Sequence, residues 1–270
     1  FLTHVEEQAG DVTRFVHFGL TSSDMLDTVS AIQMVQACAY VREELAGLEK
    51  ALMTQAEANR KTPMVGRTHG MHAEATSFGL ILLGWREMVV RAIRRFDEAV
   101  DGIRVGKLAG AVGNLAFGDP GREAAVLARF GLKPETAATQ IVARDRYAAL
   151  FTTMAVAGSV IDHIALNIRH LQRTEVGEAQ EPFSGKQRGS SAMPHKKNPI
   201  GCENVCGQAR LLRGYALAAL EDVALWHERD ISHSSVERVI GPDATATLEY
   251  IAKRLAGIVG GLVVHWDRML

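Results

Sequence analysis

Apolar residues recur every three or four positions along most of this chain, which is the spacing of one face of an α-helix. After Thr21, apolar positions that mostly have this spacing are Met25, Val29, Ile32, Val41, Leu45, Leu48 and Leu52. The same pattern predicts further helices over about residues 72–105, 121–130, 145–174, 200–227 and 244–270. No run alternates between polar and apolar residues, so no sheet is expected. The sequence therefore predicts an all-α protein, an elongated bundle of long helices.

The glycines inside these predicted helices indicate tight packing. Glycine lowers helix stability unless a neighbouring segment must approach closely, whether from the same chain or from another subunit. The glycines in question are Gly79, Gly84, Gly158, Gly257, Gly260 and Gly261. The seven prolines, in contrast, fall between the expected helices and leave long stretches without proline.

Composition narrows the class of protein. The 270 residues include 30 Lys and Arg against 31 Asp and Glu, so the net charge of −1 gives no overall attraction to nucleic acid or to an anionic membrane. The apolar runs are too short to span a bilayer. Three cysteines without a CxxC pair favour a reducing compartment, so we expect a soluble, cytoplasmic protein. Cys202 and Cys206 lack partner ligands, and no metal site is predicted.

Polar residues gather where helices are expected to begin. In HFGLTSSDMLDT, Thr21 and Asp24 have the spacing of a capping box, and Ser22 and Ser23 add hydroxyls beside the positive end of a helix. The same stretch is therefore both a helix cap and a candidate anion site.

A second polar stretch, GRTHGMHAEAT, places two histidines in a turn flanked by glycine. Thr68 and His69 follow Arg67 directly, and His72 comes three residues after His69. A histidine near a helix start is usually a capping or packing residue, but histidine also titrates near neutral pH. His69 or His72 could therefore donate a proton to a leaving group.

Two further stretches carry arginines. In ATQIVARDR, which contains Gln140, the charges are those of a capped, salt-bridged helix start. WHERDISHSSVER has its second histidine too late for an HExxH metal motif. Its charges would ordinarily form a solvated face, yet Arg229 and Arg238 could also hold a phosphate or carboxylate through paired N–H donors.

The loop GSSAMPHKKNP, residues 189–199, combines serines, a histidine and two lysines between glycine and proline. Glycine and proline keep its backbone out of regular structure, so hydroxyls, ammonium groups and free amides can bind an anion together. Dinucleotide-binding, P-loop, nucleophile-elbow and carboxylate metal motifs are all missing. The remaining chemistry suits a small substrate with several negative charges.

These stretches together resemble the fumarase/aspartase superfamily, whose members release fumarate by β-elimination, and within it the branch that cleaves adenylosuccinate. GSSAMPHKKNP is similar to the superfamily signature, and the other stretches follow in the family's order over most of the chain. The resemblance implies that residues 1–20 end an N-terminal helical domain, that 21–270 form the central bundle, and that a C-terminal domain is missing. A histidine segment of the family lies upstream of the first residue, and His4 does not match it.

The resemblance also implies roles for individual residues. Ser191 matches the general base that removes a proton from the carbon beside a carboxylate, and His69 matches the general acid that protonates the departing nitrogen. The matches to substrate contacts are Thr21, Ser22, Thr68, Gln140, Lys196, Asn198, Arg229, Ser234 and Arg238. Serine is a poor base, so Ser191 needs nearby cations and amides or a proton acceptor. His195, Lys196 and Lys197 are equal candidates for that acceptor.

As a whole, the resemblance implies a carbon–nitrogen lyase of purine biosynthesis without metal or other cofactor. Its substrates would be adenylosuccinate, which gives AMP and fumarate, and the succinylated carboxamide ribotide. Family members are homotetramers with each active site built from three subunits, and no nucleic acid or membrane partner is expected. Two alternatives stay open: another fumarate-releasing lyase or cycloisomerase of the superfamily, and a helical scaffold without catalysis. Argininosuccinate lyases usually carry Gln at the position of His195, which disfavours that branch.

Overall fold

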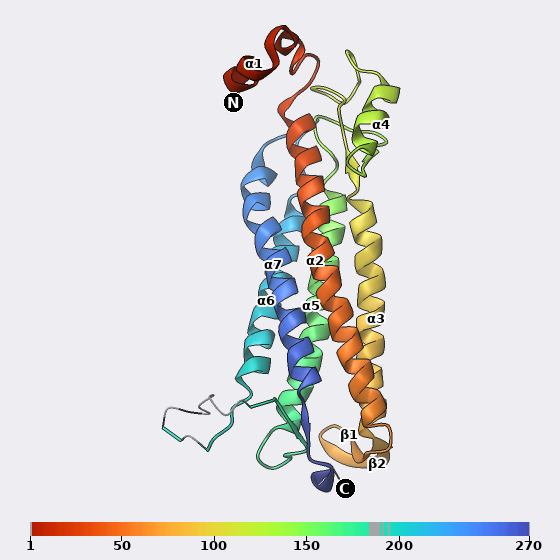
Figure 1. Ribbon diagram of the computed structural model, residues 1–270, viewed down its shortest axis with the longest axis vertical. Helices are drawn as coiled ribbons and strands as arrows, with labels where there is room; N and C mark the ends of the chain where they lie inside the picture. The colour runs from red at the N-terminus through yellow and green to blue at the C-terminus, as the bar shows by residue number, and fades with distance from the viewer. Residues whose placement is uncertain (1, 184–189, 191, 194, 270) are drawn as a thin grey trace.

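Five long helices form an elongated bundle in the computed structural model, which describes residues 2–183, 190, 192–193 and 195–269. These helices are α2 (Ser22–Ala58), α3 (Phe78–Gly102), α5 (Asp145–Leu171), α6 (Ile200–Glu221) and α7 (Ser232–Gly260). Each long helix runs opposite in direction to the one before it (Figure 1). The predicted all-α bundle is confirmed.

Helix α5 lies at the centre of the bundle and contacts α3, α6 and α7. Its side chains Leu150, Met154, Ile161, Ile164 and Ile168 are fully or almost fully buried. By length and composition alone α5 could cross a membrane, but 56% of its most apolar window is buried inside the molecule. A helix that is apolar on most sides is what the core of a large bundle requires.

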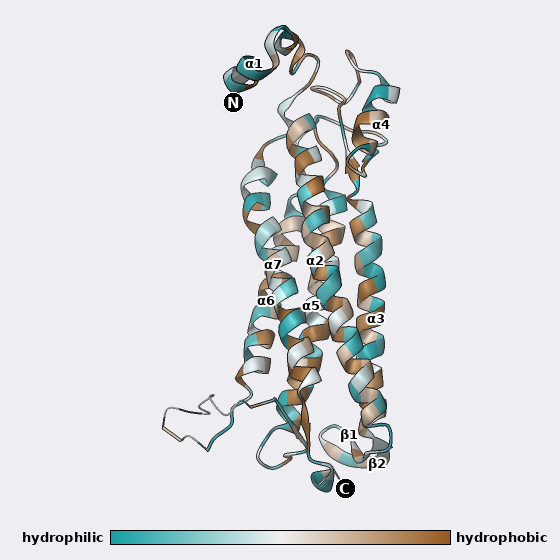
Figure 2. Ribbon diagram, viewed as in Figure 1, coloured by the Kyte–Doolittle hydropathy of each residue, from teal (hydrophilic) through white to brown (hydrophobic). Residues whose placement is uncertain are grey.

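The apolar stripe of α2 faces this core over most of its length. Val41, Leu45, Leu48 and Leu52 are at most 1% exposed, which confirms the helical spacing read from the sequence. The stripe fails in the first turns, where Met25 and Val29 are 48% and 42% exposed. Figure 2 shows apolar residues on the visible face of the long helices as well as between them.

Short strands correct the expectation of no sheet. Strands β1 (Pro63–Thr68) and β2 (Met71–Ser77) form an antiparallel hairpin at the end of α2. β3 (Val105–Gly106) pairs in parallel with β4 (Lys133–Pro134), and β5 (Ala179–Gln180) pairs antiparallel with β6 (Val263–Val264). All three pairs lie outside the long helices and connect their ends.

Two predicted helix starts are wrong. The helix expected from about residue 72 begins at Phe78, because residues 71–77 pair in the hairpin and Ser77 caps the helix by accepting from Leu80 N–H at 3.2 Å. The helix expected from about residue 244 begins at Ser232 and continues through Pro242. A proline inside a helix removes only one donor, and the buried residues on both sides of it keep α7 continuous.

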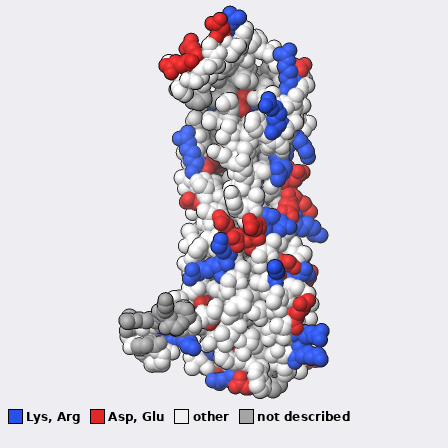
Figure 3. Space-filling view, viewed as in Figure 1, with Lys and Arg blue, Asp and Glu red and all other residues white. Residues whose placement is uncertain are grey.

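The smaller helices lie at the ends of the bundle. α1 (Leu2–Ala9) and the 3-10 helix η1 (Gly10–Phe15) precede α2, and α4 (Pro120–Ala128) follows α3, capped by Asp119. A short 3-10 helix, η2 (Trp266–Arg268), lies beside the far end of the bundle. Figure 3 shows positive and negative side chains interspersed on one face, in keeping with the balanced composition.

Candidate active site

The predicted site residues fall at opposite ends of the bundle. Thr21, Ser22, Gln140, Arg229, Ser234 and Arg238 lie where α2, α5 and α7 begin, here called the arginine end. Thr68, His69, Lys196 and Asn198 lie on the hairpin and just before α6, here called the histidine end. α2 alone has 37 residues and spans roughly 55 Å between them. One chain therefore cannot bring both groups to one substrate.

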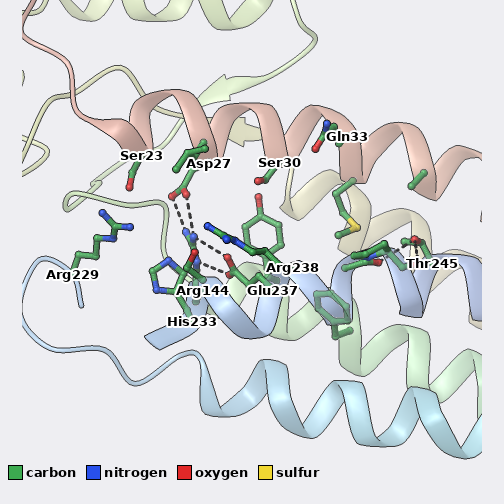
Figure 4. A pocket seen from close by; sticks show the side chains of 18 residues that line it. Ser23, Asp27, Ser30, Gln33, Arg144, Arg229, His233, Glu237, Arg238 and Thr245 are labelled. Atoms are coloured by element: carbon green, nitrogen blue, oxygen red, sulfur yellow. Dashed lines mark hydrogen bonds and ion pairs between the residues drawn. The ribbon is translucent and has the colours of Figure 1, made fainter. Parts of the chain in front are cut away.

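A cleft of about 590 Å³ opens at the arginine end between α2 and α7 (Figure 4). Its polar lining includes Ser23, Ser30, Arg229, His233, Ser234 and Arg238. Met34, Phe151 and Pro242 line the apolar part farther along the bundle. The cleft thus combines three arginines, two carboxylates that pair with one of them, and several hydroxyls with an apolar wall, as a site for a phosphate-bearing organic molecule could.

Arg144 lies in the wall of this cleft and ties three helices together. Its guanidinium donates to Asp27 on α2 at 2.7 and 3.0 Å and to Glu237 on α7 at 2.8 and 3.2 Å (Figure 4). Burial opposes the charge of Arg144, but the two carboxylates raise its pKa on balance. The prediction of a salt-bridged helix start at this segment is confirmed, since Arg144 directly precedes α5.

His233 lies beside Arg144 and is 2% exposed. Burial lowers the pKa of His233, and the positive charge of Arg144 lowers it further. Its Nδ1 has no hydrogen-bond partner within the part of the chain that the structure describes. The imidazole of His233 is therefore uncharged near neutral pH.

Gln140 and Arg229 meet at the entrance of the cleft. Arg229 Nη1 donates to Gln140 Oε1 at 3.0 Å, and Gln140 N–H donates to the Glu228 carbonyl at 3.3 Å. At the start of α2, Thr21 N–H donates to Asp24 Oδ2 at 2.7 Å, so the predicted capping box is present. The structure thus places Thr21, Gln140 and Arg229 at one end of the bundle, each held by a hydrogen bond.

At the histidine end, His69 occupies the tip of the β1–β2 hairpin. Thr68 pairs with Met71, so His69 and Gly70 form a two-residue turn in which φ is +57° and +79°. Positive φ at both central residues is the pattern of a type I′ turn, which is strained for a residue other than glycine. Both His69 and His72 are exposed, and either could face a molecule outside this chain.

The signature loop follows β5 and leads into α6. Its proposed base, Ser191, lies outside the described residues. Lys196 is exposed, and its N–H donates to the Met193 carbonyl at 2.9 Å. The first turn of α6, directly after the loop, is fixed by Glu181, whose carboxylate accepts from Gly201 N–H at 3.0 Å and Cys202 N–H at 2.5 Å. The histidine end therefore presents His69 and Lys196 outward.

The long-range pairing of some residues at the arginine end could not be read from the sequence. Asp27, Arg144 and Glu237 resemble ordinary helix charges, and only their long-range pairing reveals a shared wall. Lys107 and Asp24 are both fully buried and form an ion pair. No group of three His, Cys, Asp or Glu side chains in the described ranges could hold a metal ion.

Comparison with known proteins decides the family. The lyase family matches residues 2–214. The chain belongs to the lyase family. Its relatives in this family include adenylosuccinate lyases of Thermotoga maritima (48% identical), Synechocystis sp. (49%) and Bacillus subtilis (46%), each aligned over the whole chain. The chain spans 62% of the length of each of these relatives.

Solved lyase structures share the fold. The crystal structure of a fumarate lyase from Mesorhizobium sp. BNC1 superposes with a TM-score of 0.87 at 29% identity. A 3-carboxy-cis,cis-muconate lactonizing enzyme from Pseudomonas putida gives the same TM-score at 27% identity. Each comparison covers 99% of this chain and 60% of the other. The long-helix bundle of this chain is therefore shared with enzymes whose names describe different reactions.

Proposed function

We propose that the full-length protein is an adenylosuccinate lyase. It cleaves adenylosuccinate to AMP and fumarate, and the succinylated carboxamide ribotide to its carboxamide and fumarate. The observation that carries the proposal is the identity of 46–49% over the whole chain to three relatives with that name. The cleft with Arg229 and Arg238 supports it, because paired arginine N–H groups suit a nucleotide phosphate.

The proposed reaction needs groups from both ends of the bundle. Ser191 takes the proton from the carbon beside a succinyl carboxylate, the carbon–nitrogen bond then breaks, and His69 gives a proton to the departing nitrogen. Lys196 and Asn198 stabilise the negative charge that develops on the carboxylate. Thr21, Ser22, Thr68 and Gln140 contact the substrate, while Arg229, Ser234 and Arg238 hold its phosphate side.

The distance between the two ends supports a homotetramer. Each active site takes its arginine end from one subunit and its histidine-end groups from others, because α2 keeps them roughly 55 Å apart within a chain. Exposed apolar side chains on α2, among them Met25, Leu26 and Val29, provide surface for such contacts. The proposed location is the cytoplasm, and no cofactor is needed.

The test is the ultraviolet absorbance of adenylosuccinate incubated with the full-length protein. The proposal expects AMP and fumarate in equal amounts, and a protein that forms no fumarate would overturn it. Ser191→Ala should lower kcat by about 1,000-fold or more while AMP still binds, because a residue needed only in the transition state leaves ground-state binding intact. Near-normal turnover of Ser191→Ala would show that the base is another group.

The second candidate is a cycloisomerase of the superfamily, favoured by the superposition on the Pseudomonas putida enzyme. The same assay separates the two, because a cycloisomerase would leave adenylosuccinate intact and convert 3-carboxy-cis,cis-muconate. A non-catalytic scaffold would act on neither compound.

A further inference from the structure

A fully buried ion pair joins the start of α2 to the loop that follows β3. Lys107 Nζ contacts Asp24 Oδ1, and both side chains are 0% exposed. Lys107 Nζ also donates to the Gly110 carbonyl at 3.2 Å. Because no part of Lys107 reaches the surface, its charge is not available to bind a substrate anion.

Asp24 also accepts hydrogen bonds from three backbone amides. Its carboxylate accepts from Thr21 N–H at 2.7 Å, Ala109 N–H at 3.0 Å and Gly110 N–H at 3.2 Å. One carboxylate therefore fixes the first turn of α2 and two consecutive amides of the loop against each other. Buried charges cost free energy unless they are fully paired, so a pair this well satisfied is more useful for fixing geometry than for stability.

The same loop also contacts Gln140, which in turn contacts Arg229, and both are proposed substrate-binding residues. Gln140 Nε2 donates to the Ala111 carbonyl at 3.2 Å, one residue beyond Gly110, and Gln140 Oε1 accepts from Arg229 at 3.0 Å. At Gly113, φ is +76° and a Cβ would lie 2.1 Å from the Ala138 carbonyl oxygen. The loop after β3 and the segment that contains Gln140 are thus packed so closely that no side chain fits between them at Gly113.

We propose that Asp24 and Lys107 are the positioning pair of the arginine end. Through Thr21 N–H on one side and the loop, Gln140 and Arg229 on the other, the pair fixes three proposed substrate contacts without touching the substrate. The inference rests on the proposed function and adds two residues to it.

The test uses the full-length protein with the double substitution Asp24→Asn/Lys107→Met, which removes both charges and leaves neither one buried alone. KM for adenylosuccinate should rise about 10-fold or more, because misplaced binding groups lose contacts that the substrate needs. The matched control is Leu48→Ala, a core substitution in the middle of α2, where Leu48 is 0% exposed. Leu48→Ala should lower the Tm but keep KM within about twofold.

An unchanged KM in the double variant would overturn the proposal. It would also be overturned if Leu48→Ala lost as much Tm as the double variant and showed an equal rise in KM.

If the double variant does not fold, the substitution Thr28→Val replaces it in the test. Thr28 Oγ1 accepts from Lys107 N–H at 3.2 Å and donates to the Lys107 carbonyl at 3.3 Å, and its loss exposes no buried charge. KM should rise about threefold with an unaltered fold, and no rise contradicts the pair's role.

Amide hydrogen exchange separates failure of this inference from failure of the proposed function. Ala109 and Gly110 amides should exchange slowly in the unaltered protein and in Leu48→Ala, and faster in the pair variants, whatever the substrate is. Retained protection in the pair variants overturns the positioning role. An unaltered protein that forms no fumarate overturns the proposed function instead. The exchange rates of the Ala109 and Gly110 amides still test whether Asp24 and Lys107 fix the loop.

Discussion

His233 is a side chain whose position has a measurable consequence for stability. Its ring is buried against Arg144, within reach of the charges of Asp27 and Asp230 and near Arg229. The pKa of His233 is lowered from its ordinary value of 6.5 by burial and then by Arg144. The unfolded chain therefore binds a proton there more readily than the folded protein does.

The predicted consequence is a loss of stability in mild acid. Above the ordinary pKa both states are neutral at His233, and as the pH falls through it only the unfolded state gains the proton. From about pH 7.5 to about pH 5.5, the Tm of the unaltered protein should fall more than that of His233→Asn. Both proteins keep Glu237, whose own pKa is raised by burial. The difference between their falls in Tm therefore reports the contribution of His233. Equal falls in Tm would contradict this account.

Gly79 lets the start of α3 pack directly against the end of α2. At Gly79 a Cβ would lie 2.5 Å from the Ala56 carbonyl oxygen and 2.6 Å from the Arg60 Cα. Backbone atoms cannot move aside as a flexible side chain can. Gly158 is similarly close to Leu212, so tight packing explains part of the helical glycines.

Gly79→Ala is therefore predicted to lower the free energy of unfolding by about 1–3 kcal/mol, because the added methyl group must push two backbones apart. Gly47, also in a helix, has only the Glu44 carboxylate at 4.0 Å. Gly47→Ala should instead raise stability by about 0.5–1 kcal/mol through helix propensity. Chemical denaturation measures both, and a Gly79→Ala protein as stable as Gly47→Ala would refute the close contact.

The long helices were predictable because their apolar spacing is sustained over many turns. The hairpin was not, because β2 reads MHAEATS, which is exposed over most of its length and lacks a buried alternate face. The start of α7 was also missed, since Pro242 resembles a helix end when its packed surroundings are unknown. Motif resemblance predicts Thr21, Gln140 and Arg229 as site residues, and that stays a prediction. The contact between Asp24 and Lys107, which are 83 residues apart, could not be read from the sequence.

For the whole molecule, the arrangement of the two ends is the central observation. The arginine end carries a cleft lined by Arg229 and Arg238, whereas the histidine end presents His69 outward on a turn. α2 separates these groups by roughly 55 Å, so a site that used groups from both ends would need more than one chain. The sequence resemblance predicts site residues at both ends, but the sequence alone does not show how far apart they lie.

Subunit mixing tests this claim most directly. Full-length His69→Gln and Arg238→Ala proteins, which are altered at opposite ends of the bundle, should each be almost inactive alone, since every site lacks either the proposed general acid or a proposed phosphate contact. When they are dissociated, mixed in equal amounts and reassembled, roughly a quarter of the sites should receive both native residues from different subunits and regain fumarate release. A mixture that assembles yet stays as inactive as either variant would contradict an active site shared between subunits.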